Sequence, residues 1–95
     1  MRLIKVEPSS RTDKKYQAIF LEDDGKHKKV HFGARGYDDF TLTNDIEQRE
    51  RYLKRHSDRE KWNNPITPGA LSRWILWNKP TLTESIMDYK KRFNL

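Results

Sequence analysis

The sequence contains no cysteine, only four glycines and four prolines, and no long hydrophobic run. Without cysteine, disulfide scaffolds and thiolate metal sites are excluded, and nothing opposes an intracellular or intravirion setting. No segment approaches the roughly 20 apolar residues of a membrane span, and the N-terminal residues lack the apolar segment of a signal peptide. We therefore expect a soluble protein that is made in the cytosol, is not secreted and does not contact membranes.

Histidine is also scarce, and this bears on catalysis and metal binding. His27 and His31 are four residues apart, but they lie in a predicted hairpin and strand and not on a helix, and His56 is distant in sequence, so we expect no metal ligands and no cofactor. There is no phosphate-binding loop and no histidine beside a plausible nucleophile, which predicts a non-enzymatic protein. A small metal-dependent nuclease using Asp38, Asp39 and a nearby lysine is a remote alternative.

What the sequence has in excess is positive charge. Lysine and arginine number 20 against 14 acidic residues, which gives a net charge of +6 and favours polyanionic partners. The excess is spread along the chain and forms no basic tail. Although the mean hydropathy is low, four phenylalanines, four tyrosines and three tryptophans predict a packed core, and 95 residues suffice for one domain with a thin core.

The N-terminal third predicts three antiparallel strands at residues 3–6, 14–22 and 28–32. Asp24-Gly25 is a typical tight-turn dipeptide between the second and third strands. The charged hairpin tip, residues 23–29, is either a basic finger or a solvated turn that discourages edge pairing. Residues 33–40 follow as a loop in which the adjacent carboxylates Asp38 and Asp39 form a turn.

Residues 44–61 predict a charged helix, with Asn44 as N-cap and Glu47 at the capping-box position. We expect it to run to about His56, with an extension to Lys61 left open. Ile46 and Leu53 form its narrow apolar stripe. Three i,i+4 ion pairs are expected along it: Asp45 with Arg49, Glu47 with Arg51, and Glu50 with Lys54.

The opposite face of this helix carries Arg51, Arg55 and Arg59, and on a helical wheel Trp62 falls in line with them. A row of arginines that ends in an aromatic ring suits phosphates and a stacked base. Further support for such contacts is expected from Lys90, Lys91 and Arg92. The alternative is an ordinary solvated helix face, with Trp62 turning into the core.

Residues 67–93 predict a tryptophan-rich helical hairpin. Thr67 is an N-cap followed by Pro68, and Thr81 to Glu84 is a capping box that opens the last helix. The apolar stripe of that helix consists of Leu82, Ile86, Tyr89 and Phe93. Trp74 is expected in the core, whereas Trp77, together with Leu76, could either fill the core or bind a partner protein.

These elements predict an α+β fold. An N-terminal three-stranded antiparallel β-meander packs against two or three C-terminal α-helices. Residues 1–95 form one domain, divided into the meander (1–33), the charged helix (44–61) and the tryptophan-rich hairpin (67–93).

Two strings, KVHFGARGYDDFT and SRWILWNKPTL, resemble a family of short, basic, uncharacterised proteins encoded by large DNA viruses of protists and algae. The pattern between them that shares the resemblance consists of Asp45, Arg49, Tyr52, Arg55 and His56. The resemblance covers roughly residues 29–93. An Ala-Leu pair precedes SRW where the family pattern has a bulky aromatic. The resemblance implies a viral setting and brings no catalytic residues, cofactor or mechanism.

Together, residues and resemblance predict a non-enzymatic, virion-associated protein that binds nucleic acid, first of all DNA, through phosphates and without sequence preference. The alternative is a structural module that packs on capsid or other virion proteins, or on its own copies. Either function predicts a location in the virion or in the cytoplasm of an infected cell.

Overall fold

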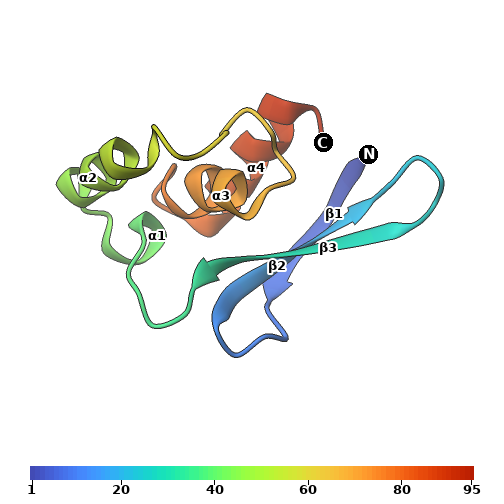
Figure 1. Ribbon diagram of the computed structural model, residues 1–95, viewed down its shortest axis with the longest axis horizontal. Helices are drawn as coiled ribbons and strands as arrows, with labels where there is room; N and C mark the ends of the chain where they lie inside the picture. Colours follow the sequence, from blue (N-terminus) through green and yellow to red (C-terminus); the bar gives the residue numbers. More distant parts are fainter.

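A computed structural model describes residues 1–95 and confirms the α+β arrangement (Figure 1). Strands β1 (Arg2–Pro8), β2 (Lys14–Leu21) and β3 (His27–Ala34) form one antiparallel sheet in the order β1-β2-β3. All three strands lie where the sequence predicts them. The turn between β2 and β3 is also confirmed, because Gly25 adopts a φ of +86° there, which glycine tolerates without steric cost.

One face of the sheet supports the helices. Leu3, Ala18, Phe20, Val30 and Phe32 point into the core, and each is at most 9% exposed. In Figure 1 all helices lie on one side of the sheet, and β2 runs between the other two strands. The fold therefore has two layers, with the core between them.

The segment after β3 contains a helix that the sequence pattern did not predict. Asp39 does not simply form a turn: its side chain caps α1 (Phe40–Thr43) by accepting a hydrogen bond from the Thr41 amide at 2.9 Å. The second carboxylate oxygen of Asp39 accepts a hydrogen bond from Lys15 Nζ at 2.6 Å. Because this ion pair links β2 to α1, it fixes how the chain leaves the sheet.

The charged helix α2 (Ile46–His56) begins one residue later than predicted. Its N-cap is Asp45, whose carboxylate accepts a hydrogen bond from the Gln48 amide at 3.1 Å. Asn44 instead ends α1 in a left-handed conformation and donates its side-chain amide to the Pro80 carbonyl at 3.0 Å. The prediction of Asn44 as N-cap is therefore wrong, since this distant carbonyl holds Asn44 in the corner between the two helices. The extension to Lys61 does not form.

The predicted contacts of α2 also need correction. Ile46 is 61% exposed, whereas Tyr52 is buried and Leu53 half-buried. None of the three expected i,i+4 ion pairs is formed. Arg49 instead lies over the Phe40 ring at 4.7 Å and donates to the Asn78 carbonyl at 3.0 Å, so it attaches α2 to the rest of the helical layer.

The tryptophan-rich hairpin begins as predicted. Thr67 caps α3 (Pro68–Leu71) through the Ala70 amide, with Pro68 in the first position. The chain then widens into one turn of π-helix, η1 (Ser72–Leu76), which ends with a hydrogen bond from the Trp77 amide to the Ser72 carbonyl. The wider turn places Ile75, Leu76 and Trp77 together in the core.

Helix α4 (Leu82–Phe93) is capped by Thr81, as predicted, and its expected apolar stripe faces the core. Tyr89 is fully buried, and its hydroxyl donates to the Pro65 carbonyl at 2.6 Å. Burial raises the pKa of Tyr89 because it disfavours the phenolate. None of the helices combines the length and the apolar character that a membrane crossing requires.

Candidate functional site

The predicted arginine face forms on α2 and the turn that follows it. Arg51 and Arg55 lie on the helix, and Arg59 lies just beyond its end. All three side chains are exposed, and none forms an ion pair with a carboxylate. Their positive charges are therefore available to an external anion.

Trp62 does not extend this row. Because α2 ends at His56, the helical wheel no longer applies at position 62. Trp62 is half-buried; its carbonyl accepts a hydrogen bond from Trp74 Nε1 at 3.0 Å, and the Arg73 guanidinium lies 5.4 Å from its ring centre. Trp62 thus joins the hairpin, as in the alternative that turns it toward the core.

The cations of the last turn of α4 form a separate group. Lys90 and Lys91 are exposed and unpaired, but Arg92 lies 3.9 Å from the centre of the Trp74 ring and 3.4 Å from the carboxylate of Asp88. In Figure 1 α2 lies at one end of the molecule, apart from α4. The two basic groups therefore belong to different helices.

The predicted partner-binding residues are both in the core. Leu76 is 2% and Trp77 is 8% exposed. Trp77 stacks against Tyr52. Neither Leu76 nor Trp77 therefore offers a surface to another protein. The sequence left this choice open because aromatic core residues and aromatic interface residues share the same composition signal.

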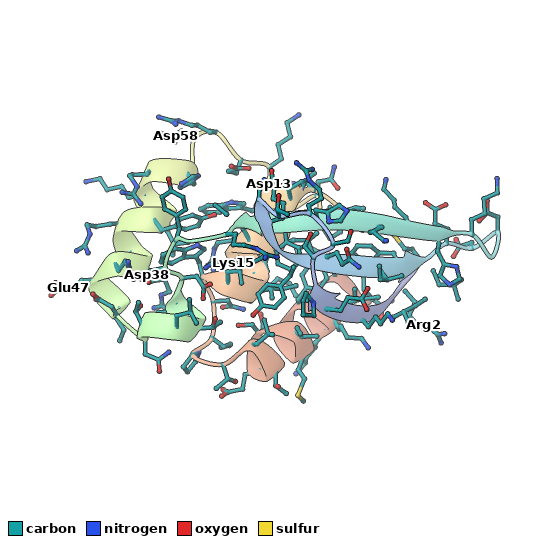
Figure 2. All side chains as sticks on the ribbon, turned by 90° about the horizontal axis from the view of Figure 1, so that it is seen from below. Arg2, Asp13, Lys15, Asp38, Glu47 and Asp58 are labelled. Carbon is teal, nitrogen blue, oxygen red and sulfur yellow. The ribbon has the colours of Figure 1, made fainter.

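A cleft with a volume of about 560 Å³ lies between the sheet and α2, and the sequence did not predict it. The start of β2, the end of β3 and the loop 35–39 contribute to its walls, as do α2, Glu60 and the segment from Pro68 to Trp77. This volume falls within the range of small-molecule sites. Figure 2 labels two lining residues: Lys15 near the centre of the view and Asp38 toward α2.

Three stacked rings form one side of the cleft. Trp77 and Tyr52 are nearly parallel, with ring centres 4.4 Å apart and planes 7° apart. The His56 ring stacks on the other face of the Tyr52 ring, with ring centres 4.2 Å apart, so the three rings form a column with Tyr52 in the middle. The side chain of His56 is 34% exposed. Burial, and then the negative charge of Glu60, raise the pKa of Tyr52 to about 12, so its hydroxyl stays protonated at neutral pH.

The carboxylates of the cleft differ in their surroundings. Asp39 is 2% exposed, and its oxygens are taken by Thr41 and Lys15. Asp38 is exposed and has no ion pair. Since Asp39 is fully used in holding α1, the pair considered for a nuclease does not present two free carboxylates. No group of three potential metal-ligating side chains occurs in the structure.

The cations of the cleft complete its chemistry. Lys14 and Arg55 line it and carry no ion pair, so the arginine face of α2 continues into the cleft through Arg55. Aromatic rings, free cations and the unpaired carboxylate of Asp38 in one cleft can hold a planar polar group with an attached anion. The signals in the sequence were Tyr37, Tyr52 and His56, but only the folded chain brings them to one place.

Comparison with known proteins finds no match among curated proteins and none among solved structures. Residues 4–56, more than half of the chain, match a family of unknown function, DUF5754. The match extends from β1 to the end of α2 and overlaps the resemblance noted above on residues 29–56. The description of this family names no source organism, so the viral setting stays a prediction. On this match, the chain belongs to the DUF5754 family.

Proposed function

We propose that this protein is a non-enzymatic nucleic-acid-binding protein that contacts phosphates through the exposed arginines of α2. The observation that carries the proposal is the absence of any carboxylate partner for Arg51, Arg55 and Arg59, although acidic residues are spaced along the same helix. Arginine forms bidentate contacts with phosphate, and such contacts position a nucleic acid without reading its sequence.

The net charge supports the same function. With a charge of +6, the protein attracts polyanions over distances comparable to the Debye length. Lys14 lines the same cleft as Arg55 and is equally free of ion pairs, so it adds to the positive charge there. Lys90 and Lys91 form a second basic group, which a long strand could reach as well.

The test is a salt titration of binding with a charge-matched control. Replacing Arg51, Arg55 and Arg59 together by glutamine removes two charges from α2 and one from the turn after it, and glutamine favours helix as arginine does. The control replaces Lys26, Lys28 and Lys29 at the exposed hairpin tip, which removes the same charge elsewhere. Fluorescence anisotropy with labelled DNA measures the affinity at several salt concentrations.

The α2 variant should bind more weakly and show a shallower salt dependence. Each lost phosphate contact reduces the slope of log K against log salt by about 0.9 on duplex DNA and about 0.7 on single strands. The control should keep most of the affinity. Equal losses in the two variants, or no binding by the unmodified protein at low salt, would overturn the proposal.

A further inference from the structure

We infer that the cleft between the sheet and α2 takes one unstacked base of a single-stranded nucleic acid. This inference rests on the proposed function and narrows it from nucleic acids in general to single strands. The volume of about 560 Å³ is large enough for a nucleotide unit. In a duplex each base is stacked and paired, so only a single strand can insert a base without paying the cost of unpairing.

Two aromatic side chains offer stacking surfaces. His56 uses one ring face against Tyr52, and its partly exposed side chain ends the column of three rings. Tyr37 lines the cleft from the loop 35–39, is 72% exposed, and has neither an aromatic neighbour nor a side-chain hydrogen bond. A large aromatic ring exposed without a partner in the wall of a cleft is suited to stacking on a base.

The charges of the cleft indicate which part of the nucleotide enters. Asp38 and Glu60 line the cleft beside Lys14 and Arg55. Asp38 has no cationic partner, and Glu60 has only the His56 ring nitrogen at 3.6 Å. Carboxylates repel phosphate but accept hydrogen bonds from exocyclic amino groups, such as the amino group of cytosine.

The phosphates of the bound strand then lie at the rim of the cleft and outside it. Arg55 belongs both to the cleft lining and to the arginine face, so a phosphate adjoining the inserted base can meet it. Arg51 and Arg59 continue the same exposed face for neighbouring phosphates. This arrangement predicts a preference for bases that carry an amino group, cytosine above all, over thymine and uracil.

The experiment compares oligonucleotides of equal length made of cytidine or thymidine, and a duplex of mixed sequence, by fluorescence anisotropy at one salt concentration. The unmodified protein should bind the cytidine strand several-fold more tightly than the thymidine strand or the duplex. Tyr37→Ala should lower the affinity for the cytidine strand roughly tenfold and leave duplex binding unchanged. Tyr37→Phe should bind the cytidine strand as tightly as the unmodified protein does, because the aromatic ring is kept.

Ile46→Ala is the matched control, since it removes an exposed apolar side chain at the start of α2 that does not line the cleft. It should bind all three ligands as the unmodified protein does. Asp38→Asn should reduce the preference for cytidine over thymidine, which a purely structural role of Asp38 would not do. Titration with cytidine monophosphate alone separates a strand site from a mononucleotide site.

The outcomes distinguish this inference from the proposed function. If the α2 glutamine variant loses binding while Tyr37→Ala binds every ligand normally, the arginine face binds nucleic acid and the base site is wrong. Equal affinity for single strand and duplex would also overturn the base site. Cytidine monophosphate binding as tightly as the oligonucleotide would overturn the assignment of the cleft to a strand, because it would show a mononucleotide site instead. If no nucleic acid binds at all, both proposals fail together.

Discussion

At the scale of single residues, Gly33 shows how one position joins the two layers of the fold. It lies near the end of β3 with a φ of +80°, in the left-handed region that side chains disfavour. An added Cβ would lie 2.8 Å from Leu76 Cδ1 and 3.3 Å from Lys15 Cβ. Glycine is therefore required both by the backbone angle and by the close approach of η1 to the sheet.

Gly33→Ala should lower the free energy of unfolding by about 2–4 kcal/mol, the sum of left-handed strain and overpacking against Leu76. Gly25→Ala is the control, because Gly25 has a φ of +86° but nothing within 4 Å of an added Cβ. It should cost only the strain, about 1–2 kcal/mol. Urea denaturation measures both values, and equal losses would show that Leu76 does not restrict position 33.

The sequence predicted the turn at Gly25 but not the packing role of Gly33. A tight turn depends on neighbours in the sequence, so the Asp-Gly pair was sufficient. The restriction at Gly33 comes from Leu76, which is distant in sequence. For the same reason the exposure of Ile46 and the burial of Tyr52 could not be read from a wheel with two apolar positions, since distant Trp77 decides which face is covered.

At the scale of elements, caps made by local side chains were predictable and those made by distant groups were not. Thr67 and Thr81 cap their helices as expected, because each hydroxyl meets an amide three residues later. Asn44 and Asp45 both suit an N-cap, and the carbonyl of Pro80 decides between them. Helix α1 escaped prediction because four residues carry no periodic pattern, and its position depends on the ion pair between Lys15 and Asp39.

Removing one partner of that ion pair should be strongly destabilising, since its side chains are only 13% and 2% exposed and the other charge would stay buried. Lys15→Met would leave the Asp39 carboxylate buried without its cation, and we expect a loss of about 3 kcal/mol in the free energy of unfolding. Lys14→Met is the control: it removes the same charge one residue earlier without breaking an ion pair. Equal urea midpoints for the two variants would contradict this account of how α1 is anchored.

At the scale of the whole molecule, the fold combines a well-buried centre with a helix attached at one end. The sheet, η1 and α4 supply most of the fully buried side chains, and the backbone amide of Leu3 bonds to the Leu95 carbonyl at 3.1 Å, which ties the two ends of the chain together. By contrast, Tyr52 is the one residue of α2 that is buried. The candidate site therefore lies between the most and the least firmly held parts of the protein.

Stability should be distributed in the same way, because elements with few buried apolar contacts open locally before the core unfolds. We expect amide hydrogens in the middle of α2, such as those of Tyr52 and Leu53, to exchange through openings that cost less free energy than those of Ala18 and Phe20 in β2. Native-state hydrogen exchange followed by NMR measures these free energies. Similar values in α2 and β2 would show one cooperative unit and contradict this division.

If a single strand binds across α2 and the cleft, its addition should slow exchange in α2 more than in β2, since a ligand stabilises most the part whose opening releases it.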